Sequence, residues 1–204
     1  MFFELIRTMT NADWSIFVVT LLAYVFIALG IVKDKGKGQS AFSWFLWLIL
    51  DVILFLSILD GNGKSIFMLA PSMLGSLVIS ILLYLCQKRK KIVLKDWEWI
   101  NIFLISVTAI VWQVSKDPNT AIAFGVAAQV LAGVELSIES WKNPTPGWTT
   151  LGYLMFVASC VLSLATEGNA FTHFTIQDHL FPTMLGLQTV VDTIPLILKT
   201  FKKQ

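Results

Sequence analysis

The sequence predicts an all-α, polytopic membrane protein whose seven transmembrane helices form two parallel three-helix repeats joined by a linker helix. Three observations support this prediction: the composition, the length of the apolar runs and a motif that occurs twice. Hydrophobic residues make up 56% of the 204-residue chain and charged residues only 14%, whereas soluble domains average about 25% charged residues. The apolar residues come in runs of about twenty, the length with which an α-helix crosses roughly 30 Å of hydrocarbon.

Polar connections that contain glycine, proline or clustered charge separate the apolar runs. The expected spans are 13–32, 41–59, 65–86, 100–114, 120–140, 148–165 and 180–201. The residues before the first span mix apolar with charged side chains over too short a stretch for a cleaved signal peptide. We expect them to form an interfacial lead.

The first three spans have recognisable ends. The first opens on Asp13 and Trp14, a polar cap beside an interfacial aromatic, and ends at a charged, glycine-containing connection, 33–40. The second carries Asp51 near its middle and leads into a tight turn. The third ends at 87–91, the strongest basic run of the chain.

The other four spans are bounded in the same way. The fourth follows the acidic and aromatic segment 96–99 and is broken at 115–119. The fifth is rich in alanine and glycine, a composition that lets membrane helices approach closely. A proline-containing loop, 143–147, precedes the sixth, and the longest polar connection, 166–179, precedes the seventh.

The frame Leu-x-Pro-(Ser/Thr)-Met-Leu-Gly occurs at 69–75 in the third span and at 180–186 in the seventh. Coincidence between leucine-rich helices is the alternative to an internal duplication. In both triplets of spans the middle one opens with a tryptophan, Trp44 or Trp148. Because a three-span unit begins and ends on opposite faces, one extra span is needed to restore the orientation of a second copy. The predicted division is therefore 1–12 (interfacial lead), 13–87 (first bundle), 88–118 (linker helix), 119–201 (second bundle) and 202–204 (tail).

In its seven spans, repeat order and length, the chain resembles the SWEET/PQ-loop superfamily, including nicotinamide riboside transporters of the PnuC type. The resemblance implies a 3+1+3 parallel repeat related by an axis along the membrane normal. The segment 37–43 is similar to the one that follows the Pro-Gln pair of that superfamily, but the pair itself is absent and neither the first nor the fifth span contains a proline.

Basic residues are strongly biased toward one face. Twelve lie in the connections after the first, third and fifth spans or at the C-terminus, and three lie on the opposite face. The positive-inside rule then places the C-terminus in the cytoplasm and the N-terminus outside. We expect the protein to lie in the plasma (inner) membrane.

Carboxylates within apolar spans are the strongest candidates for a functional site, because each costs several kcal/mol unless it faces protein or water. Asp51, Glu135 and Asp192 qualify. Asp192 shares a face of the seventh span with Gln188, four residues earlier. An interhelical hydrogen bond that only holds the bundle together is the alternative role for Asp51 and for Asp192.

Two further side chains complete the expected site. Trp47 lies one turn before Asp51 on the same face, so a ring could stack on its indole, and Gln129 is a polar member of the fifth span. Trp44 is expected to belong to the interfacial aromatic belt. His173 and His179 are expected to be solvated in the outward-facing connection.

The repeated motif supplies expected hinge elements. A proline within a helix removes one backbone hydrogen bond and kinks the chain, and in each copy a glycine follows four residues later. These residues are Pro71, Gly75, Pro182 and Gly186. A static kink is the alternative to a hinge.

These observations favour a transporter of a small polar solute (a sugar, nucleoside or vitamin-like compound) by alternating access between the two bundles, most simply by facilitated diffusion. The alternative is a non-transporting sensor, scaffold or accessory protein. We expect no enzymatic activity, catalytic residue, metal site, cofactor or nucleic-acid partner, because no histidine, cysteine and carboxylate cluster or phosphate loop is visible. The expected partners are the solute and the lipid bilayer, and homo-oligomerisation is left open.

Overall fold

A computed structural model describes residues 9–36, 39, 41–60, 65–87, 96–142, 144, 147–166 and 174–201, and all secondary structure in these residues is helical. Seven of the helical segments are long and apolar enough to cross a membrane. The prediction of an all-α, polytopic membrane protein is therefore confirmed. The elements are α2 (Asn11–Asp34), α3 (Ala41–Asp60), α4 (Ile66–Gln87), α5 (Asp96–Ser115), α6 (Pro118–Lys142), α7 (Trp148–Thr166), the π-helix η1 (Ile176–Leu180) and α8 (Phe181–Phe201).

The helix ends follow local capping chemistry. Thr10 caps α2, because its hydroxyl accepts from the Asp13 backbone N–H while the Asp13 carboxylate accepts from the Thr10 backbone N–H. At the other end Lys35 adopts a left-handed conformation with φ 53°. The Gly36 N–H donates to the Ile31 carbonyl at 2.9 Å, which closes the final turn.

The start of α6 has a different cap. Pro118 occupies the first helical position, where a missing N–H costs nothing. Asp117 precedes it and accepts from the Thr120 hydroxyl at 2.5 Å and the Thr120 N–H at 3.0 Å. These hydrogen bonds hold the pKa of the Asp117 carboxyl below its ordinary value. The helix therefore begins two residues before the expected span, as α5 likewise begins early, at Asp96.

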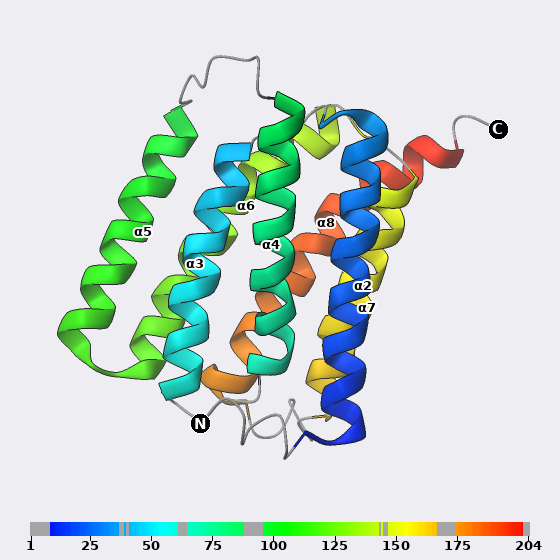
Figure 1. Cartoon of the computed structure of the whole chain (residues 1–204). Coiled ribbons are helices and arrows are strands. Elements are labelled where there is room, and N and C mark those ends of the chain that lie inside the picture. Colours follow the sequence, from blue (N-terminus) through cyan, green and yellow to red (C-terminus); the bar gives the residue numbers. More distant parts are fainter. Residues whose placement is uncertain are drawn as a thin grey trace.

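The helices alternate in direction and fall into two groups of similar internal order (Figure 1). In one group α4 lies between α2 and α3, and in the other α8 lies between α6 and α7. The groups meet where α2 packs on α7 and where α3 packs on α6. Exchanging α2 with α6, α3 with α7 and α4 with α8 leaves this set of neighbours unchanged. The division into two repeated bundles remains a prediction.

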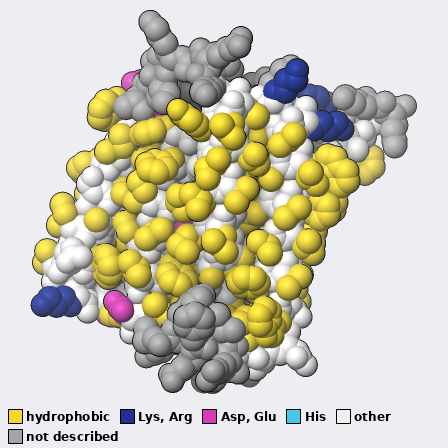
Figure 2. All heavy atoms as spheres, viewed as in Figure 1, with side chains coloured by type: hydrophobic (Ala, Val, Ile, Leu, Met, Phe, Trp, Pro, Cys, Tyr) yellow, Lys and Arg dark blue, Asp and Glu magenta, His cyan; other side chains and the backbone are white. Residues whose placement is uncertain are grey.

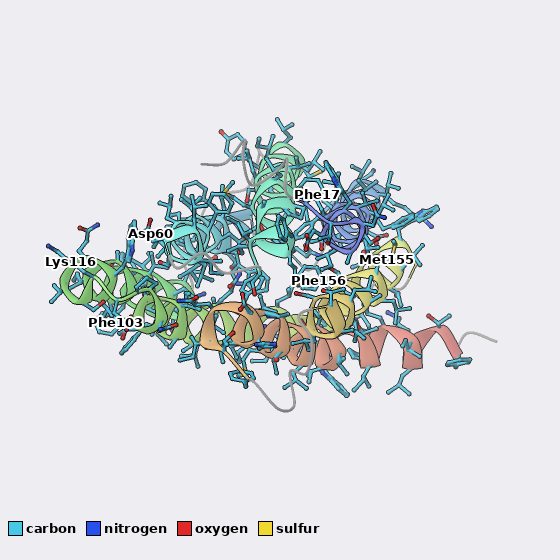
Figure 3. All side chains as sticks on the ribbon, turned by 90° about the horizontal axis from the view of Figure 1, so that it is seen from below. Phe17, Asp60, Phe103, Lys116, Met155 and Phe156 are labelled. Carbon is cyan, nitrogen blue, oxygen red and sulfur yellow. The ribbon has the colours of Figure 1, made fainter. Side chains whose placement is uncertain are left out.

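In the sequence, α5 connects the two groups. In space it lies at one edge of the bundle, both in the side view and in the view along the helices (Figures 1 and 3). It contacts α6 and, less extensively, α3. Its outer side chains are strongly exposed: Phe103 is 65% exposed and Val114 77%. Large apolar side chains cover the visible face of the molecule over several other helices as well (Figure 2). Such a surface is suited to hydrocarbon.

Small residues make the contact between α2 and α7 close. A methyl group on Gly30 would overlap the Thr149 hydroxyl, and one on Gly152 would lie 2.6 Å from Ile27 Cγ1. The hydroxyls of Thr20 and Ser159 hydrogen-bond across the same interface. Membrane helices associate mainly through such close packing and interhelical hydrogen bonds. This interface therefore fixes the two groups to each other along one side.

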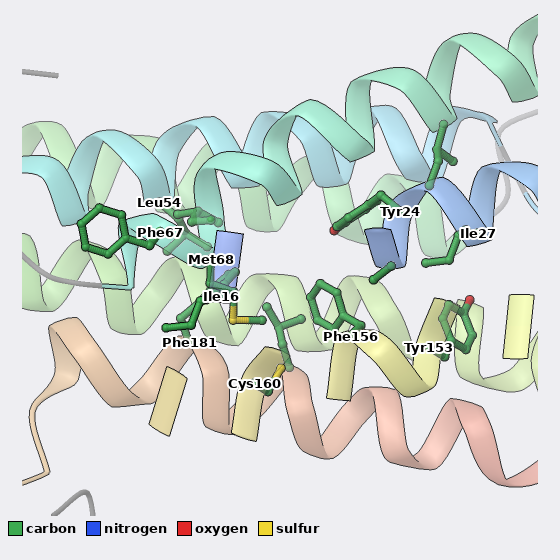
Figure 4. Close-up of a cluster of buried hydrophobic side chains, with 14 of the residues drawn as sticks. Ile16, Tyr24, Ile27, Leu54, Phe67, Met68, Tyr153, Phe156, Cys160 and Phe181 are labelled. Atoms are coloured by element: carbon green, nitrogen blue, oxygen red, sulfur yellow. The ribbon is translucent and has the colours of Figure 1, made fainter. Parts of the chain in front are cut away.

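A cluster of buried apolar side chains from α2, α4, α7 and α8, with members from α3 and α6, fills the interior of the bundle (Figure 4). Tyr24 and Phe156 meet edge to face with ring centroids 5.8 Å apart. Phe181 and Met68 are fully buried in the same cluster, near the starts of α8 and α4. This cluster forms the apolar centre of the bundle.

The connection before α8 differs from the expectation. His179 was expected to be solvated, but it is 2% exposed, because η1 continues directly into α8 and turns the ring inward. The His179 Nδ1 accepts from the Thr175 N–H at 3.0 Å. His173 lies outside the described residues.

The two prolines of the repeated motif are not in equivalent positions. Pro71 lies inside α4, whereas Pro182 is the second residue of α8. Because Pro182 has no N–H, it cannot donate to the Asp178 carbonyl four residues earlier. That carbonyl accepts from the Ser65 hydroxyl at 2.6 Å, which ties the start of α4 to the start of α8. The hinge role of Pro71 and Pro182 stays a prediction.

The two motif glycines also differ in their surroundings. A methyl group on Gly75 would overlap the Tyr24 ring, whereas one on Gly186 would lie 3.1 Å from Cys160 Cβ and 3.4 Å from its Sγ. Gly75 therefore has a packing role independent of any hinge: it admits the Tyr24 ring between α2 and α4.

This difference gives a matched test. Gly75→Ala should destabilise the protein by about 1–3 kcal/mol, because the Tyr24 ring must move in a packed interior. Gly186→Ala should cost less than about 1 kcal/mol, since the gain in helix propensity offsets a mild contact. The midpoint of unfolding of the purified variants in detergent measures both. Equal losses in the two variants would show that the Tyr24 contact is not the reason for Gly75.

Candidate functional site

Asp51 lies near the middle of α3 and joins three helices. Its Oδ2 accepts from the Ser76 hydroxyl of α4 at 2.7 Å, and its Oδ1 accepts from Gln129 Nε2 of α6 at 2.6 Å. The side chain is 1% exposed. Both carboxylate oxygens are therefore engaged, and the Gln129 bond crosses the contact between α3 and α6.

The aromatic side chains near Asp51 form a connected series. The centroid of Trp47 lies 5.6 Å from that of Trp44, and Trp44 lies 6.4 Å from Tyr24 on α2. Trp47 is partly buried and packs against the hydrophobic core. Trp44 is 5% exposed and donates from Nε1 to Gln39 Oε1 at 2.9 Å. The expectation that Trp44 belongs to an interfacial belt is therefore wrong: its ring is buried, beside those of Tyr24 and Trp47.

A second polar group lies between α6 and α8. Gln188 and Asp192 are 9% and 3% exposed, one turn apart on the inner face of α8. Gln188 packs directly over Gly133, where any side chain on α6 would overlap its amide. Asp192 lies beside Ser137 of α6 and within electrostatic range of Tyr153 of α7.

These side chains have unused hydrogen-bonding capacity. Among the described residues, Gln188 Nε2 and Oε1, Asp192 Oδ1 and Gln129 Oε1 are buried without a hydrogen-bond partner. A buried polar group without a partner costs about 1–3 kcal/mol. The cost is hard to explain as bundle stabilisation alone, because an apolar side chain would avoid it.

The stripe Gln129, Gly133 and Ser137 on α6 connects the two groups. Consecutive members are four residues apart, so each lies about one turn further along and 40° round the helix. Gln129 contacts Asp51, Gly133 accommodates Gln188, and Ser137 lies beside Asp192. The side chains of Asp51, Gln188 and Asp192 thus lie along one face of α6, the face that carries Gln129. Trp47 lies one turn before Asp51 on α3.

The two copies of the repeated motif bury different faces. Leu77 and Ile81 of α4 are 42% and 50% exposed, whereas the residues at the same distance after the motif in α8 are the buried Gln188 and Asp192. Leu74 is exposed in the first copy and Leu185 is buried in the second. The polar residues therefore occur where α8 turns its face inward and α4 faces outward.

Several residues of this region were not expected from the sequence: Ser76, Gly133, Ser137, Tyr153 and Tyr24. Serine and glycine are common in membrane helices, so their presence alone indicates nothing. The spacing of four residues between Gln129, Gly133 and Ser137 was the one signal that could have found two of them.

The remaining polar candidates lie elsewhere. Glu135 is on α6, but its side chain is outside the described part of the structure. Asn101 of α5 is buried, and neither of its amide atoms has a partner among the described residues. In the same part of the chain, no group of three or more His, Cys, Asp and Glu residues is arranged to hold a metal ion.

Together these features define an integral membrane protein with buried polar side chains at mid-depth. Comparison with protein-family models, curated proteins and solved structures gives no match. Any functional assignment therefore depends on the geometry of these side chains.

The Asp51–Gln129 contact can be tested by a double-mutant cycle with Asp51→Leu and Gln129→Met. Each single variant should lose stability, because it leaves the other side chain buried without its partner. The double variant should be less destabilised than the sum, with a coupling energy of about 1–2 kcal/mol. Unfolding in mixed micelles measures all four proteins. Additive losses would contradict the contact.

Proposed function

We propose that the protein transports a small polar solute (a sugar, nucleoside or vitamin-like compound) across the membrane, by alternating access between the groups α2–α4 and α6–α8. The observation that carries the proposal is the set of buried polar atoms of Gln129, Gln188 and Asp192 at mid-depth that have no partner among the described residues. A bound solute would supply the missing hydrogen bonds, so the cost of burying these atoms becomes part of solute recognition.

The position of this set also suits transport. Gln129 lies at the contact of α3 with α6, while Gln188 and Asp192 lie on α8, the central helix of the second group. Because the Asp51–Gln129 hydrogen bond links the two groups, separating α3 from α6 would break it. The Gln129 amide would then be free to bind solute. In this proposal Asp51 acts as a gate between the groups, and Gln188 and Asp192 form the permanent part of the site.

The other candidate function is a non-transporting sensor, scaffold or accessory protein. One observation favours it: Asp51 is sealed, with both oxygens hydrogen-bonded, as expected of a carboxylate that only holds helices together. Asp192 and Gln188 do not follow that pattern among the described residues. Solute flux distinguishes the two functions.

We place the protein in the plasma (inner) membrane, and the bias of basic residues supports an orientation with the ends of α2, α4, α6 and α8 toward the cytoplasm. Among the described residues, Lys33, Lys35, Lys142 and Lys199 lie at the ends of α2, α6 and α8, and Lys116 lies at the opposite ends of the helices, between α5 and α6.

Transport is tested with purified protein in proteoliposomes and a labelled panel of sugars, nucleosides and vitamin-sized heterocycles. Uptake of at least one compound should exceed that of protein-free liposomes. Gln188→Leu should lower this uptake about tenfold or more, because the amide is lost from the site. Gln177→Leu, the same change in η1, is the control and should retain uptake. No uptake of any compound would favour the non-transporting alternative.

Orientation is tested with a membrane-impermeant maleimide on spheroplasts. The exposed Cys86 near the end of α4 should react only after permeabilisation. Lys116→Cys, at the opposite ends of the helices, should react in intact spheroplasts when Cys86 is replaced by serine. The buried Cys160 should remain unlabelled in both. The reverse pattern would place the C-terminal end of α8 outside.

A further inference from the structure

We propose that the transported solute is a small organic cation that carries N–H donors, with its positive charge held by Asp192 and its other polar groups by Gln188. This inference narrows the substrate class of the proposed function and therefore rests on it. Three features of the described residues lead to it: the unused hydrogen-bonding atoms, the distribution of charge, and the contrast between the two buried aspartates.

The first feature is the free capacity of the α8 site. Asp192 Oδ1 and Gln188 Oε1 are acceptors, and neither has a donor among the described residues. Gln188 Nε2 is the one donor group of this set, and it likewise lacks a partner there. A ligand that satisfies the site must therefore bring donors for a carboxylate oxygen and an amide oxygen.

The second feature is charge. Lys33, Lys35, Lys116, Lys142 and Lys199 are the basic residues other than histidine in the described part of the chain, and all lie at or beyond helix ends. Lys199 lies on the same helix as Asp192, seven residues or about 10 Å further on, and Lys142 is exposed at the end of α6, five residues after Ser137. The Lys199 Nζ donates to the Pro144 carbonyl at 2.8 Å. No described lysine is therefore placed to neutralise Asp192.

A buried carboxylate without a counter-charge selects strongly by charge. Two like charges about 4 Å apart in the interior of a protein repel each other enough to weaken binding roughly a thousandfold. An anionic solute beside Asp192 would meet that repulsion, and Asp51 adds to it from α3. A cation would instead form a charge-assisted hydrogen bond with Asp192.

The third feature is the contrast with Asp51. Ser76 and Gln129 already occupy both Asp51 oxygens. Asp192 Oδ1 has no partner in the part of the chain that the structure describes, and Gly133 leaves room on α6 for the neighbouring Gln188. The two carboxylates therefore have separate roles: Asp51 joins helices and Asp192 binds the solute.

The first experiment uses the wild-type protein in nanodiscs and three trios of probes, each with an ammonium, a hydroxyl or a carboxylate on one skeleton. The trios are glucosamine, glucose and glucuronate; 5-aminopentanol, 1,5-pentanediol and 5-hydroxypentanoate; and benzylammonium, benzyl alcohol and benzoate. At pH 6.5, binding is measured by thermal stabilisation of the protein. At least one ammonium compound should bind about tenfold or more tightly than both other members of its trio.

The second experiment measures uptake of the best-bound ammonium compound into proteoliposomes. An inside-negative potential set with potassium and valinomycin should accelerate it, because net positive charge enters with the solute. Asp192→Asn should weaken binding of the cation about tenfold to a hundredfold and leave the hydroxyl member of the trio unchanged. Asp60→Asn, the same change at the exposed end of α3, is the control and should match wild type.

The outcomes separate this inference from the proposed function. Binding and uptake of neutral or anionic probes, with no preference for the ammonium member, would overturn the inference and leave transport standing. Potential-dependent uptake of a neutral probe that requires sodium or a proton gradient would also overturn it, since the charge at Asp192 would then belong to a coupling ion. No uptake of any probe or of the wider solute panel would contradict the inference and the proposed function together.

Discussion

The centre of the molecule depends on the two hydrogen bonds that the Asp51 carboxylate accepts. It accepts one hydrogen bond from α4 and one from α6, so three helices from both groups meet at a single side chain. A carboxylate in hydrocarbon is tolerated when protein groups replace its hydration, and here two donors at 2.6 and 2.7 Å do so. Any motion that separates α3 from α6 must break one of them. The same bond that stabilises the closed arrangement therefore opposes its opening.

The second constraint is the space that small residues leave on α6. Gly133 admits the Gln188 amide, and the neighbouring turns carry Gln129 and Ser137. On the other side of the molecule, glycines bring α2 and α7 together, and the polar groups named at that interface are the hydroxyls of Thr20, Thr149 and Ser159. Close approach is thus used in two ways: it fixes one interface through packing, and it holds polar groups together at the other.

The spans and the fold class followed from the chain alone, because hydrocarbon requires about twenty apolar residues for each crossing. The helix ends shifted by a few residues where capping chemistry intervened, as with Asp117 and Pro118 at the start of α6. The candidate site was predicted in part. Asp51, Gln129, Gln188 and Asp192 are buried together along one stripe of α6, whereas Trp44 and His179 are buried against expectation. Their burial depends on long-range packing, which a hydropathy pattern does not contain.

The repeated motif shows what the sequence determines and what depends on tertiary packing. By itself the sequence determined that two proline- and glycine-containing segments begin two similar helices, and that only the second continues with Gln188 and Asp192. Only the tertiary structure decided that α4 turns Leu77 and Ile81 outward while α8 turns the corresponding polar residues inward. The physical reason is that a helix buries the face its neighbours cover, and α6 covers α8 on the side that carries Gln188 and Asp192.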